Sequence, residues 1–564
     1  MSNVALDEAS PPDYRSVPGS VSYSRVALIV AVVVAPILQL AQSLIALRLL
    51  PPFWKFYADP PYMYLFNSLS LGTGLTPQHV DHPGTSLQWL MAGIERITFV
   101  ASGLRSSLPA DIAWFPEKYL SATGVVLAVI FAGSMAFLTL RITRTFGSLA
   151  GVVSAAAILG ASGLTVPWLV TATPEAVVAS CSLLILALLV PTMADRDRQP
   201  AVPVVLTMGL LFAVGLTAKV IMAPLVISVI VMLKWRQIIG FGLSAVAAAL
   251  VILVPVFELF PRMFGWFTNL AGSSGRYGGD SPTSITSNFV TGMQTATVEY
   301  WLVWAALIVL VVMAVAYWRG ARSRESLSVL IAAGGLGAGI AAVLAVSFKE
   351  TTDRDFILLV GLVPTLLALG MSAWARSRVE LDGRVDHGRT WVAVVVVGVL
   401  ALSAIVSNVS SFRELTGISE RVDEEAVILQ EATPDSGTVI HSFLARNEFY
   451  PLMLGSEWAY HPYSQEILTR FPDNIFYNPF LSTLFGNSRQ GNIGYLNCDD
   501  LTPLIQGDGL TFVMPGDYSA PNPEGEGRFE LQDGTALIFA PGDVQLYQGP
   551  LSTITITECL SPPT

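Results

Sequence analysis

The stretch VALIVAVVVAPILQLAQSLIAL, residues 26–47, decides the class of protein before any other feature of the chain. It contains no Asp, Glu, Lys or Arg, and a helix that crosses the hydrocarbon core of a bilayer needs about 20 apolar residues. It is too long for a signal peptide and no small-residue cleavage site follows it, so we interpret it as a retained first membrane helix. Residues 1–24 are polar and rich in Pro and Ser, which predicts a disordered tail.

The rest of the chain repeats this pattern. Hydrophobic residues make up 52% of the sequence and charged residues 13%, whereas a soluble domain usually carries about a quarter charged residues. A charge at the bilayer centre costs at least about 2.5 kcal/mol, so uncharged runs of this length belong in lipid. The uncharged segments are 26–47, 120–140, 148–170, 176–194, 202–218, 220–233, 237–257, 300–318, 327–348, 356–374 and 391–409. We therefore predict a polytopic α-helical membrane protein with about 11 transmembrane helices.

The basic residues predict how the chain is oriented. Short basic loops face the cytoplasm, and the loops after even-numbered segments hold Arg141, Arg144, Arg196, Arg198, Lys234, Arg236, Arg319, Arg322, Arg324, Arg376, Arg378, Arg384 and Arg389. The N-terminus is therefore expected in the cytoplasm, and an odd number of helices puts the C-terminus outside. The predicted domains are a cytoplasmic tail (1–24), a transmembrane domain (25–410) with large outer loops at 51–118 and 258–299, and an extracytoplasmic domain (411–564).

The C-terminal domain has a composition of its own. From Phe412 onward there is no lysine, and acidic residues outnumber arginine by roughly three to one. Alternating runs at 437–443 and 511–514 predict strands, and the stretch 445–459 between them predicts a helix, so we expect a small α/β domain. Cys498 and Cys559 both lie in this domain. Outside the cytoplasm they either form a disulfide or remain two thiols, and their spacing does not decide between these.

The first outer loop is polar and aromatic: YADPPYMYLFNS at 57–68 and TPQHVDHPG at 76–84. Proline suits the first turn of a helix, so a short helix is expected just after Asp59, and the segment 86–101 is expected to lie as an amphipathic helix on the membrane surface. Asp59 then either caps this helix or serves chemistry. His79, Asp81 and His82 either form the turn before Pro83 or join Asp59 as a metal site; the spacing favours the turn, and no metal is predicted.

Further charged residues gather where helices are expected to end on the outer side. They are Glu175, Lys219, Arg276, Lys349 and Arg354. The cations either bind phosphate or extend towards lipid headgroups, and the glycines around Arg276 would let the backbone approach a phosphate closely. This pattern predicts a site at the outer membrane interface rather than in mid-membrane.

Taken in order, these motifs resemble the GT-C superfamily of membrane glycosyltransferases, and most closely its protein O-mannosyltransferases and lipid A aminoarabinose transferases. The stretches that carry the resemblance are the first outer loop, TATPEA at 171–176, GLTAKVIMAPLV at 215–226 and FKETTDRDFILLVGLVP at 348–364, followed by the outer α/β domain. The sequence departs from the family at Asp59-Pro60, where the mannosyltransferases carry Asp-Glu, and at Asp355-Phe356, where Arg-Tyr is common.

The resemblance implies an inverting, membrane-bound glycosyltransferase without a cofactor. It would move a sugar from a polyprenyl phosphate in the bilayer to an extracytoplasmic hydroxyl of a glycan, lipid or protein, and no nucleic acid is expected as a partner. Asp59 would be the general base, a role that contributes about 10²–10⁴-fold. The donor would be held by Lys219, Arg276, Lys349 and Arg354, and the acceptor cavity would be formed by Tyr62, Tyr64, His79, Asp81, His82 and Glu175, with the tyrosines acting as sugar platforms or as supports of the fold.

Three other classes of protein stay open at this point. A lipid-linked glycan polymerase or ligase would use the same chemistry on a longer donor. A transporter or flippase would place ionisable residues or broken helices near mid-membrane, and no charged residue lies in the middle of a predicted helix. A regulatory membrane protein would only bind a partner through its outer domain. The glycine-rich stretch 332–342 indicates close helix packing rather than a transport path.

Overall fold

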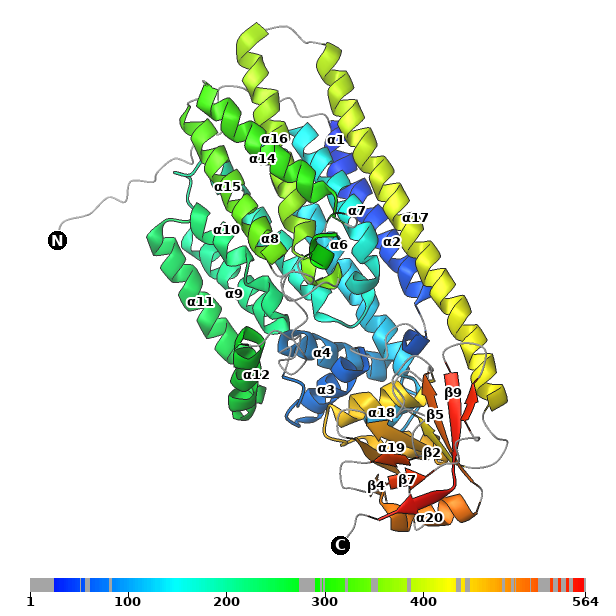
Figure 1. The fold of residues 1–564 in the computed structure, drawn as a ribbon. Helices are drawn as coiled ribbons and strands as arrows, with labels where there is room; N and C mark the ends of the chain where they lie inside the picture. Colours follow the sequence, from blue (N-terminus) through cyan, green and yellow to red (C-terminus); the bar gives the residue numbers. More distant parts are fainter. Residues whose placement is uncertain are drawn as a thin grey trace, which may run out of the picture.

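A long bundle of helices carries a β-sheet domain at one of its ends (Figure 1). The computed structural model describes residues 25–50, 52–55, 61–80, 84–272, 290–294, 297, 300–319, 323–345, 353–382, 387–432, 438–441, 447–478, 482–487, 491, 493–507, 509–515, 528–530, 536–538, 544–546 and 551–561. The predicted tail at 1–24 lies outside them. The predicted fold class, a polytopic helical protein with a C-terminal α/β domain, is confirmed.

Each predicted apolar segment coincides with helix in the described chain. The bundle consists of α1 (Arg25–Ile29), η1 (Val30–Val34), α2 (Ala35–Leu49), α6 (Pro116–Phe146), α7 (Ser148–Val170), α8 (Pro174–Ala194), α9 (Val202–Ala218), η3 (Val220–Met222), α10 (Leu225–Met232), α11 (Trp235–Leu253), α14 (Leu302–Arg319), α15 (Arg324–Ala345), α16 (Leu359–Asp382) and α17 (His387–Ala432). Seven described helices are long and apolar enough to cross a membrane, and four apolar helices are shorter.

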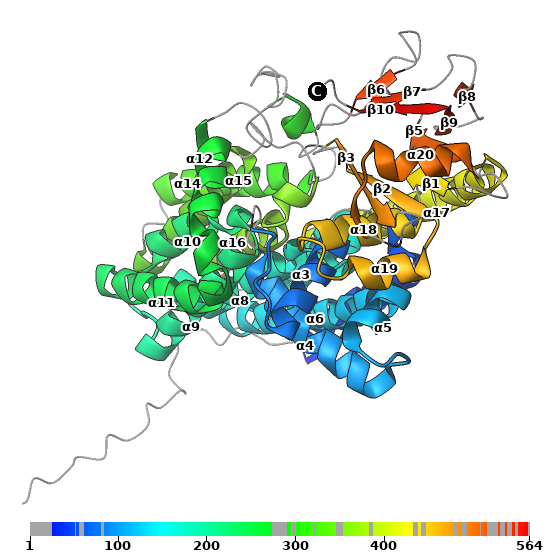
Figure 2. The same cartoon turned by 90° about the horizontal axis from the view of Figure 1, so that it is seen from below.

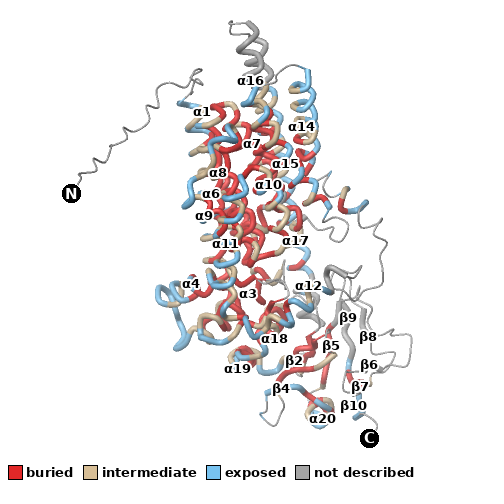
Figure 3. Tube along the Cα trace, turned by 90° about the vertical axis from the view of Figure 1, so that its left-hand side faces the viewer, coloured by how far each residue is buried: buried red, intermediate tan, exposed pale blue. Residues whose placement is uncertain are grey.

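Burial separates inner from outer helices. The apolar window of α8 is 83% buried, whereas that of α11 and the turns after it is only 6% buried and exposes large side chains such as Leu243 and Val251. Figure 3 shows buried residues along the middle of the bundle and exposed ones on its outer helices. A helix that is apolar on every side is buried in protein or in lipid, so the exposed apolar surface of α11 is what a bilayer would cover.

The predicted first outer loop folds under the end of the bundle that carries the sheet domain (Figure 1). It contains η2 (Phe53–Lys55), α3 (Pro61–Thr73), α4 (Thr85–Ser102) and α5 (Leu108–Trp114). The helix expected just after Asp59 is therefore present and begins at Pro61. In α4, Leu87, Met91 and Ile94 are buried, so the apolar face expected to rest on lipid packs largely on protein.

A mixed sheet forms the C-terminal domain. Its strand order is β4-β3-β2-β1-β5-β9-β8, with β1 parallel to both β2 and β5, and α18 (Phe449–Glu457), α19 (Ser464–Arg470) and α20 (Cys498–Gln506) complete the domain. The strands are β1 (Thr438–His441), β2 (Asn474–Asn478), β3 (Thr483–Asn487), β4 (Ile493–Tyr495), β5 (Leu510–Pro515), β8 (Val544–Leu546) and β9 (Leu551–Ile556), with a second sheet of β6 (Arg528–Glu530), β7 (Ala536–Ile538) and β10 (Glu558–Leu560). Cys498 and Cys559 form a disulfide.

The helix α17 runs through the predicted domain boundary at 410/411 and ends only at Ala432. The boundary was placed where the apolar run ends, but Arg and Glu are good helix formers, so a change in polarity does not end the helix. The sheet then begins at Thr438.

The sheet domain packs directly on the first loop. A Cβ added to Gly455 of α18 would lie 2.6 Å from the carbonyl oxygen of Tyr62 in α3, so the two helices touch at backbone level. Arg470 of α19 binds Glu448 through two hydrogen bonds of 2.7 and 2.5 Å and also donates to the Ala113 carbonyl at 3.1 Å. The domain is therefore fixed to α3 and α5.

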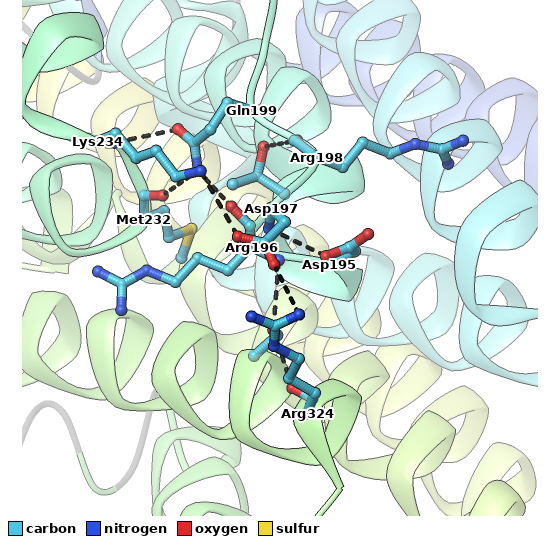
Figure 4. Close-up of polar contacts among 10 residues, drawn as sticks. Asp195, Arg196, Asp197, Arg198, Gln199, Met232, Lys234 and Arg324 are labelled. Atoms are coloured by element: carbon cyan, nitrogen blue, oxygen red, sulfur yellow. Dashed lines mark hydrogen bonds and ion pairs between the residues drawn. The ribbon is translucent and has the colours of Figure 1, made fainter.

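The other end of the bundle carries exposed ion pairs. Asp197, in the loop between α8 and α9, lies 3.6 Å from Nζ of Lys234 and 3.7 Å from a guanidinium nitrogen of Arg324 (Figure 4). Gln199 ties the same loop to the start of α11, because its side chain accepts from the Lys234 backbone N–H at 3.0 Å. These basic residues are among those that predict the cytoplasmic side.

Candidate active site

Four charged side chains meet at the end of the bundle that faces α3 and α4. Nζ of Lys219 donates to Oε1 of Glu175 at 2.8 Å and to Oδ1 of Asp355 at 2.9 Å. These three side chains are almost fully buried, with 7%, 2% and 7% of their surface exposed, respectively. Arg354, beside Asp355 in the sequence, is only partly buried. We call these four residues the charged cluster.

Local sequence explains how three separate segments supply this cluster. Pro174 is the first residue of α8, which places Glu175 in the first helical turn. The helix α9 ends at Ala218, and Lys219 is extended, with φ −156° and ψ 137°. Arg354 and Asp355 belong to the short helix η6 (Asp353–Phe356) that precedes α16. All three segments are helix ends, so their charged side chains lie at the end of the bundle and not in its middle.

The charges in the cluster are balanced but unequally exposed. Its two carboxylates and two cations cancel formally, and Lys219 is held between both carboxylates. The guanidinium carbon of Arg354 lies 5.6 Å from the ring centroid of Trp168, near the end of α7. Arg354 is therefore the more exposed of the two cations in this cluster, while Lys219 joins the three helix ends.

Gly84, the last residue of the sequence motif His82-Pro83-Gly84 (the H-P-G motif), lies beside the cluster. The backbone N–H of Gly84 donates to the Ala218 carbonyl at 3.1 Å, one residue before Lys219, and Oγ of Ser86 donates to the Val214 carbonyl at 2.8 Å. Gly84 has φ +56°, and an added Cβ would lie 2.2 Å from the Tyr64 ring. Only glycine fits this position, because both its backbone conformation and its space exclude a side chain.

Asn67 fixes the chain just before this motif. Its side-chain oxygen accepts the backbone N–H groups of Gln78 at 2.7 Å and His79 at 2.9 Å. Its amide nitrogen donates to the carbonyls of Met63 at 2.8 Å and Trp458 at 3.3 Å. Asn67 is fully buried, so it links α3, the segment before the motif and the end of α18 in one network.

The imidazole of His79 is part of this packing. It makes edge contacts with the rings of Tyr64, 5.3 Å away, and Trp458, 5.2 Å away. Burial, with a contribution from Arg262, lowers the pKa of His79 to about 4. His79 is therefore neutral at physiological pH and supports this segment of the first loop from within.

The two predicted aromatic platforms are buried as well. Tyr62 and Tyr64 expose 0% and 1% of their surface. The Tyr62 hydroxyl donates to the carboxylate of Glu117, which also accepts the Phe53 backbone N–H at 2.8 Å. Burial and the neighbouring Glu117 raise the pKa of Tyr62 well above its ordinary value. Of the two roles expected for these tyrosines, the observed contacts are those of fold supports.

The structure thus brings some predicted site residues together and leaves others undescribed. Glu175, Lys219 and Arg354 meet in the charged cluster, and Tyr62, Tyr64 and His79 form the layer beside it. Asp59, Asp81, His82, Arg276 and Lys349 lie outside the described residues.

Sequence reasoning missed Asp355 as the second partner of Lys219, although its departure from the family pattern was a signal. Among the residues described, no group of three or more His, Cys, Asp or Glu could hold a metal ion.

An apolar cavity adjoins the cluster. It has a volume of about 460 Å³ and lies between α7, α14, α16 and α17, with Ala161, Tyr300, Leu359, Val363, Leu402 and Val406 among its lining residues. The ring of Tyr300 contacts that of Phe356, 6.0 Å away between centroids, and Phe356 follows Asp355 directly. The cavity is therefore linked to η6 through the contact between Tyr300, which lines it, and Phe356.

Comparison with known proteins gives matches in structure alone. No family model and no curated protein matches the chain. Two crystal structures of ArnT from Cupriavidus metallidurans, one bound to undecaprenyl phosphate and one in the apo state, each align over 92% of this chain and 97% of theirs, at 13% identity and a TM-score of 0.45. ArnT is a GT-C lipid A aminoarabinose transferase.

Proposed function

We propose that this protein is an inverting membrane glycosyltransferase that moves a sugar from a polyprenyl phosphate to a hydroxyl at the membrane surface. The observation that carries the proposal is the buried cluster of Glu175, Lys219 and Asp355, which sits where the first loop docks on the bundle and beside an apolar cavity. An anionic head and a long apolar tail are the two features of such a donor, and this place offers a partner for each.

Arg354 is the residue we propose for the donor phosphate. When the sugar leaves, the phosphate gains negative charge, and a cation fixed beside it stabilises the transition state more than the ground state. Lys219 acts through the cluster, because its ammonium group is occupied by two carboxylates and holds η6 in place. Arg276 and Lys349 are proposed as further donor contacts from their positions in the sequence. The first isoprenoid units would occupy the apolar cavity.

Asp59 is the residue we propose as the general base. It lies two residues before Pro61, the first residue of α3. Two contacts lead from α3 to the cluster, one between Tyr64 and Gly84 and one between Gly84 and Ala218. In the reaction the carboxylate takes the acceptor proton while the acceptor oxygen bonds to the anomeric carbon. The bond from that carbon to the phosphate oxygen breaks, and the phosphate leaves with the electron pair. A single displacement of this kind inverts the anomeric centre.

Two alternatives differ from this proposal in defined ways. A lipid-linked glycan polymerase or ligase would carry out the same displacement with a longer donor, and Asp59 would keep its role. A transporter would place its charges near mid-membrane, whereas the charged cluster lies where helices end. The position of the cluster therefore favours the enzyme over the transporter.

We further propose that the sheet domain and the site face the outside of the cell membrane. The Cys498–Cys559 disulfide supports this, because disulfides persist in oxidising compartments. The basic residues Arg196, Lys234 and Arg324 lie where α8 ends and where α11 and α15 begin, at the end of the bundle opposite the sheet domain (Figure 1). A reporter fused after Ser411 is expected to be active only outside the cytoplasm, and one fused at Arg322 only inside. The reverse result would put the site on the side where nucleotide sugars are available and would remove the reason for a lipid donor.

The function is tested by transfer from a polyprenyl-phosphate sugar with purified wild-type and Asp59→Asn protein. Asparagine keeps the shape and a capping oxygen but not the basicity, so transfer should fall by about 10²-fold or more while the melting temperature stays nearly unchanged. Asp197→Asn, a carboxylate change at the opposite end of the bundle, is the matched control and should transfer normally. Full activity in Asp59→Asn would return this residue to helix capping, and loss of wild-type activity with a chelator would indicate a metal site instead.

A further inference from the structure

A group of aromatic and polar side chains lies at the β3–β4 edge of the sheet domain, away from the charged cluster. The ring of His461 stacks on Phe485 with 4.1 Å between centroids and an angle of 2°. Tyr495 stands edge-on to both rings, at 5.9 Å from His461 and 5.4 Å from Phe485. Tyr495 is 59% exposed and the neighbouring Tyr460 is 64% exposed. We call Glu457, Tyr460, His461, Phe485 and Tyr495 the edge cluster.

The backbone beneath this cluster adopts an uncommon conformation. Tyr460 and His461 both have positive φ, +61° and +59°, and residues other than glycine rarely adopt this region of backbone conformation. Backbone strain of this kind gathers at binding sites. Here the left-handed pair follows the end of α18 and presents the imidazole of His461 to Phe485.

Two polar atoms of the cluster lack partners. Oε2 of Glu457 and Nε2 of His461 are buried, and neither makes a hydrogen bond with any residue that the structure describes. Nδ1 of His461 is within 3.1 Å of Oγ of Ser464. A buried polar atom without a partner is costly. The hydroxyl groups of a ligand would supply partners to these two atoms once the side chains that cover them shift.

The charge of the cluster is low near neutral pH. Burial raises the pKa of Glu457 to about 7 and lowers the pKa of His461 to about 4. His461 is therefore neutral and Glu457 is only partly ionised, which suits an uncharged polar ligand better than an anion or a cation.

Packed side chains connect the edge cluster with the layer beside the charged cluster. Trp458, one residue after Glu457, contacts His79 ahead of the H-P-G motif. On the other side, Arg262 of α12 (Phe260–Gly272) donates to the Tyr460 hydroxyl at 2.8 Å. The β3–β4 edge of the sheet lies towards α12 in both views of the fold (Figures 1 and 2).

We propose that the edge cluster binds a carbohydrate chain, and that this chain is the acceptor of the transfer reaction. Aromatic faces pack against the C–H faces of sugars, and sugar hydroxyls both donate and accept hydrogen bonds, which matches a carboxylate oxygen and a neutral imidazole nitrogen. An alkyl chain would cover the rings but leave both polar atoms unpaired. The acceptor role rests on the proposed function, whereas the binding of the sugar chain does not.

Binding is tested without turnover on the full-length protein in nanodiscs, by calorimetric titration with linear hexasaccharides of glucose, mannose, galactose and arabinose. At least one of the four should bind. Tyr495→Ala should weaken that binding by about tenfold, as expected for loss of one central aromatic contact, whereas Tyr495→Phe should retain it. Glu457→Gln, which keeps the shape of the side chain, should also weaken it. Leu560→Ala, at a 40% exposed position on the second sheet, is the control and should bind normally.

The results separate this inference from the proposed function. Absence of binding for all four hexasaccharides, or unchanged affinity in Tyr495→Ala, would overturn the glycan site even if transfer to another acceptor proceeds. Binding by a protein that transfers no sugar would keep the glycan site and overturn the acceptor role. If both hold, Tyr495→Ala should slow transfer to the bound hexasaccharide and leave transfer to a simple monosaccharide glycoside unchanged, while Asp59→Asn should slow both.

Discussion

At one end of the helix bundle the ion pairs of Asp197 are exposed, and at the other end the ion pairs of Lys219 are buried. Asp197, Lys234 and Arg324 expose 63%, 52% and 91% of their side chains and pair at 3.6 and 3.7 Å. Lys219 pairs at 2.8 and 2.9 Å with carboxylates that are almost fully buried. Both ends pair Lys or Arg with Asp or Glu, and the two ends differ in how far water reaches the paired groups.

Physical chemistry assigns different consequences to the two ends. An exposed ion pair contributes about 0–1 kcal/mol, because water and salt screen it. Removing one partner of a buried pair leaves an uncompensated charge and costs about 3–5 kcal/mol. The exposed pairs can therefore vary with little effect, whereas the buried group constrains where η6 and α8 sit. The presence of a buried ionic group does not by itself show that the group stabilises the fold. We propose instead that this group serves donor binding.

The largest expected effect is the loss of the buried cation. Lys219→Met should destabilise the protein by about 3–5 kcal/mol, seen as a clear drop in melting temperature in detergent, because Glu175 and Asp355 then lie buried without their partner. Lys234→Met at the exposed end is the matched control and should change stability by less than about 1 kcal/mol. Adding Glu175→Gln and Asp355→Asn to Lys219→Met should recover part of the loss. Equal melting temperatures for the two lysine variants would show that burial does not separate the ends.

A smaller effect is expected at Gly84, which joins the first loop to the buried end. Gly84 and Gly74 both have positive φ, +56° and +84°, but a Cβ would meet the Tyr64 ring at 2.2 Å in the first and nothing within 4 Å in the second. Gly84→Ala should therefore cost about 2–3 kcal/mol and slow transfer, since backbone strain and overpacking add. Gly74→Ala should cost only the strain, about 1–2 kcal/mol. An equal loss of stability in the two variants would mean that the Tyr64 ring moves aside at no cost, and would contradict this prediction.

The sequence predicted the elements better than their contacts. Apolar runs marked the bundle helices because uncharged length is a local property, and the helix at Pro61 and the strands β1 and β5 followed from local signals as well. The pairing of Lys219 with Asp355 joins positions 136 residues apart, and no local pattern encodes it. The burial of Tyr62 and Tyr64 depends on contacts with other segments, such as Glu117 for Tyr62 and His79 for Tyr64. The edge cluster depends on positive φ angles at Tyr460 and His461, which the sequence does not signal because neither residue is glycine.

A density map of the full chain with a bound polyprenyl phosphate tests the proposed donor site most directly. We predict that the phosphate lies beside Arg354 and that the first isoprenoid units enter the cavity next to Tyr300. The Asp59 carboxylate should lie within roughly 15 Å of the phosphate, a span that one sugar and a hydrogen-bond reach of about 3 Å can bridge. A phosphate bound elsewhere, or one that lies beside Arg354 but farther than this from Asp59, would contradict the proposal.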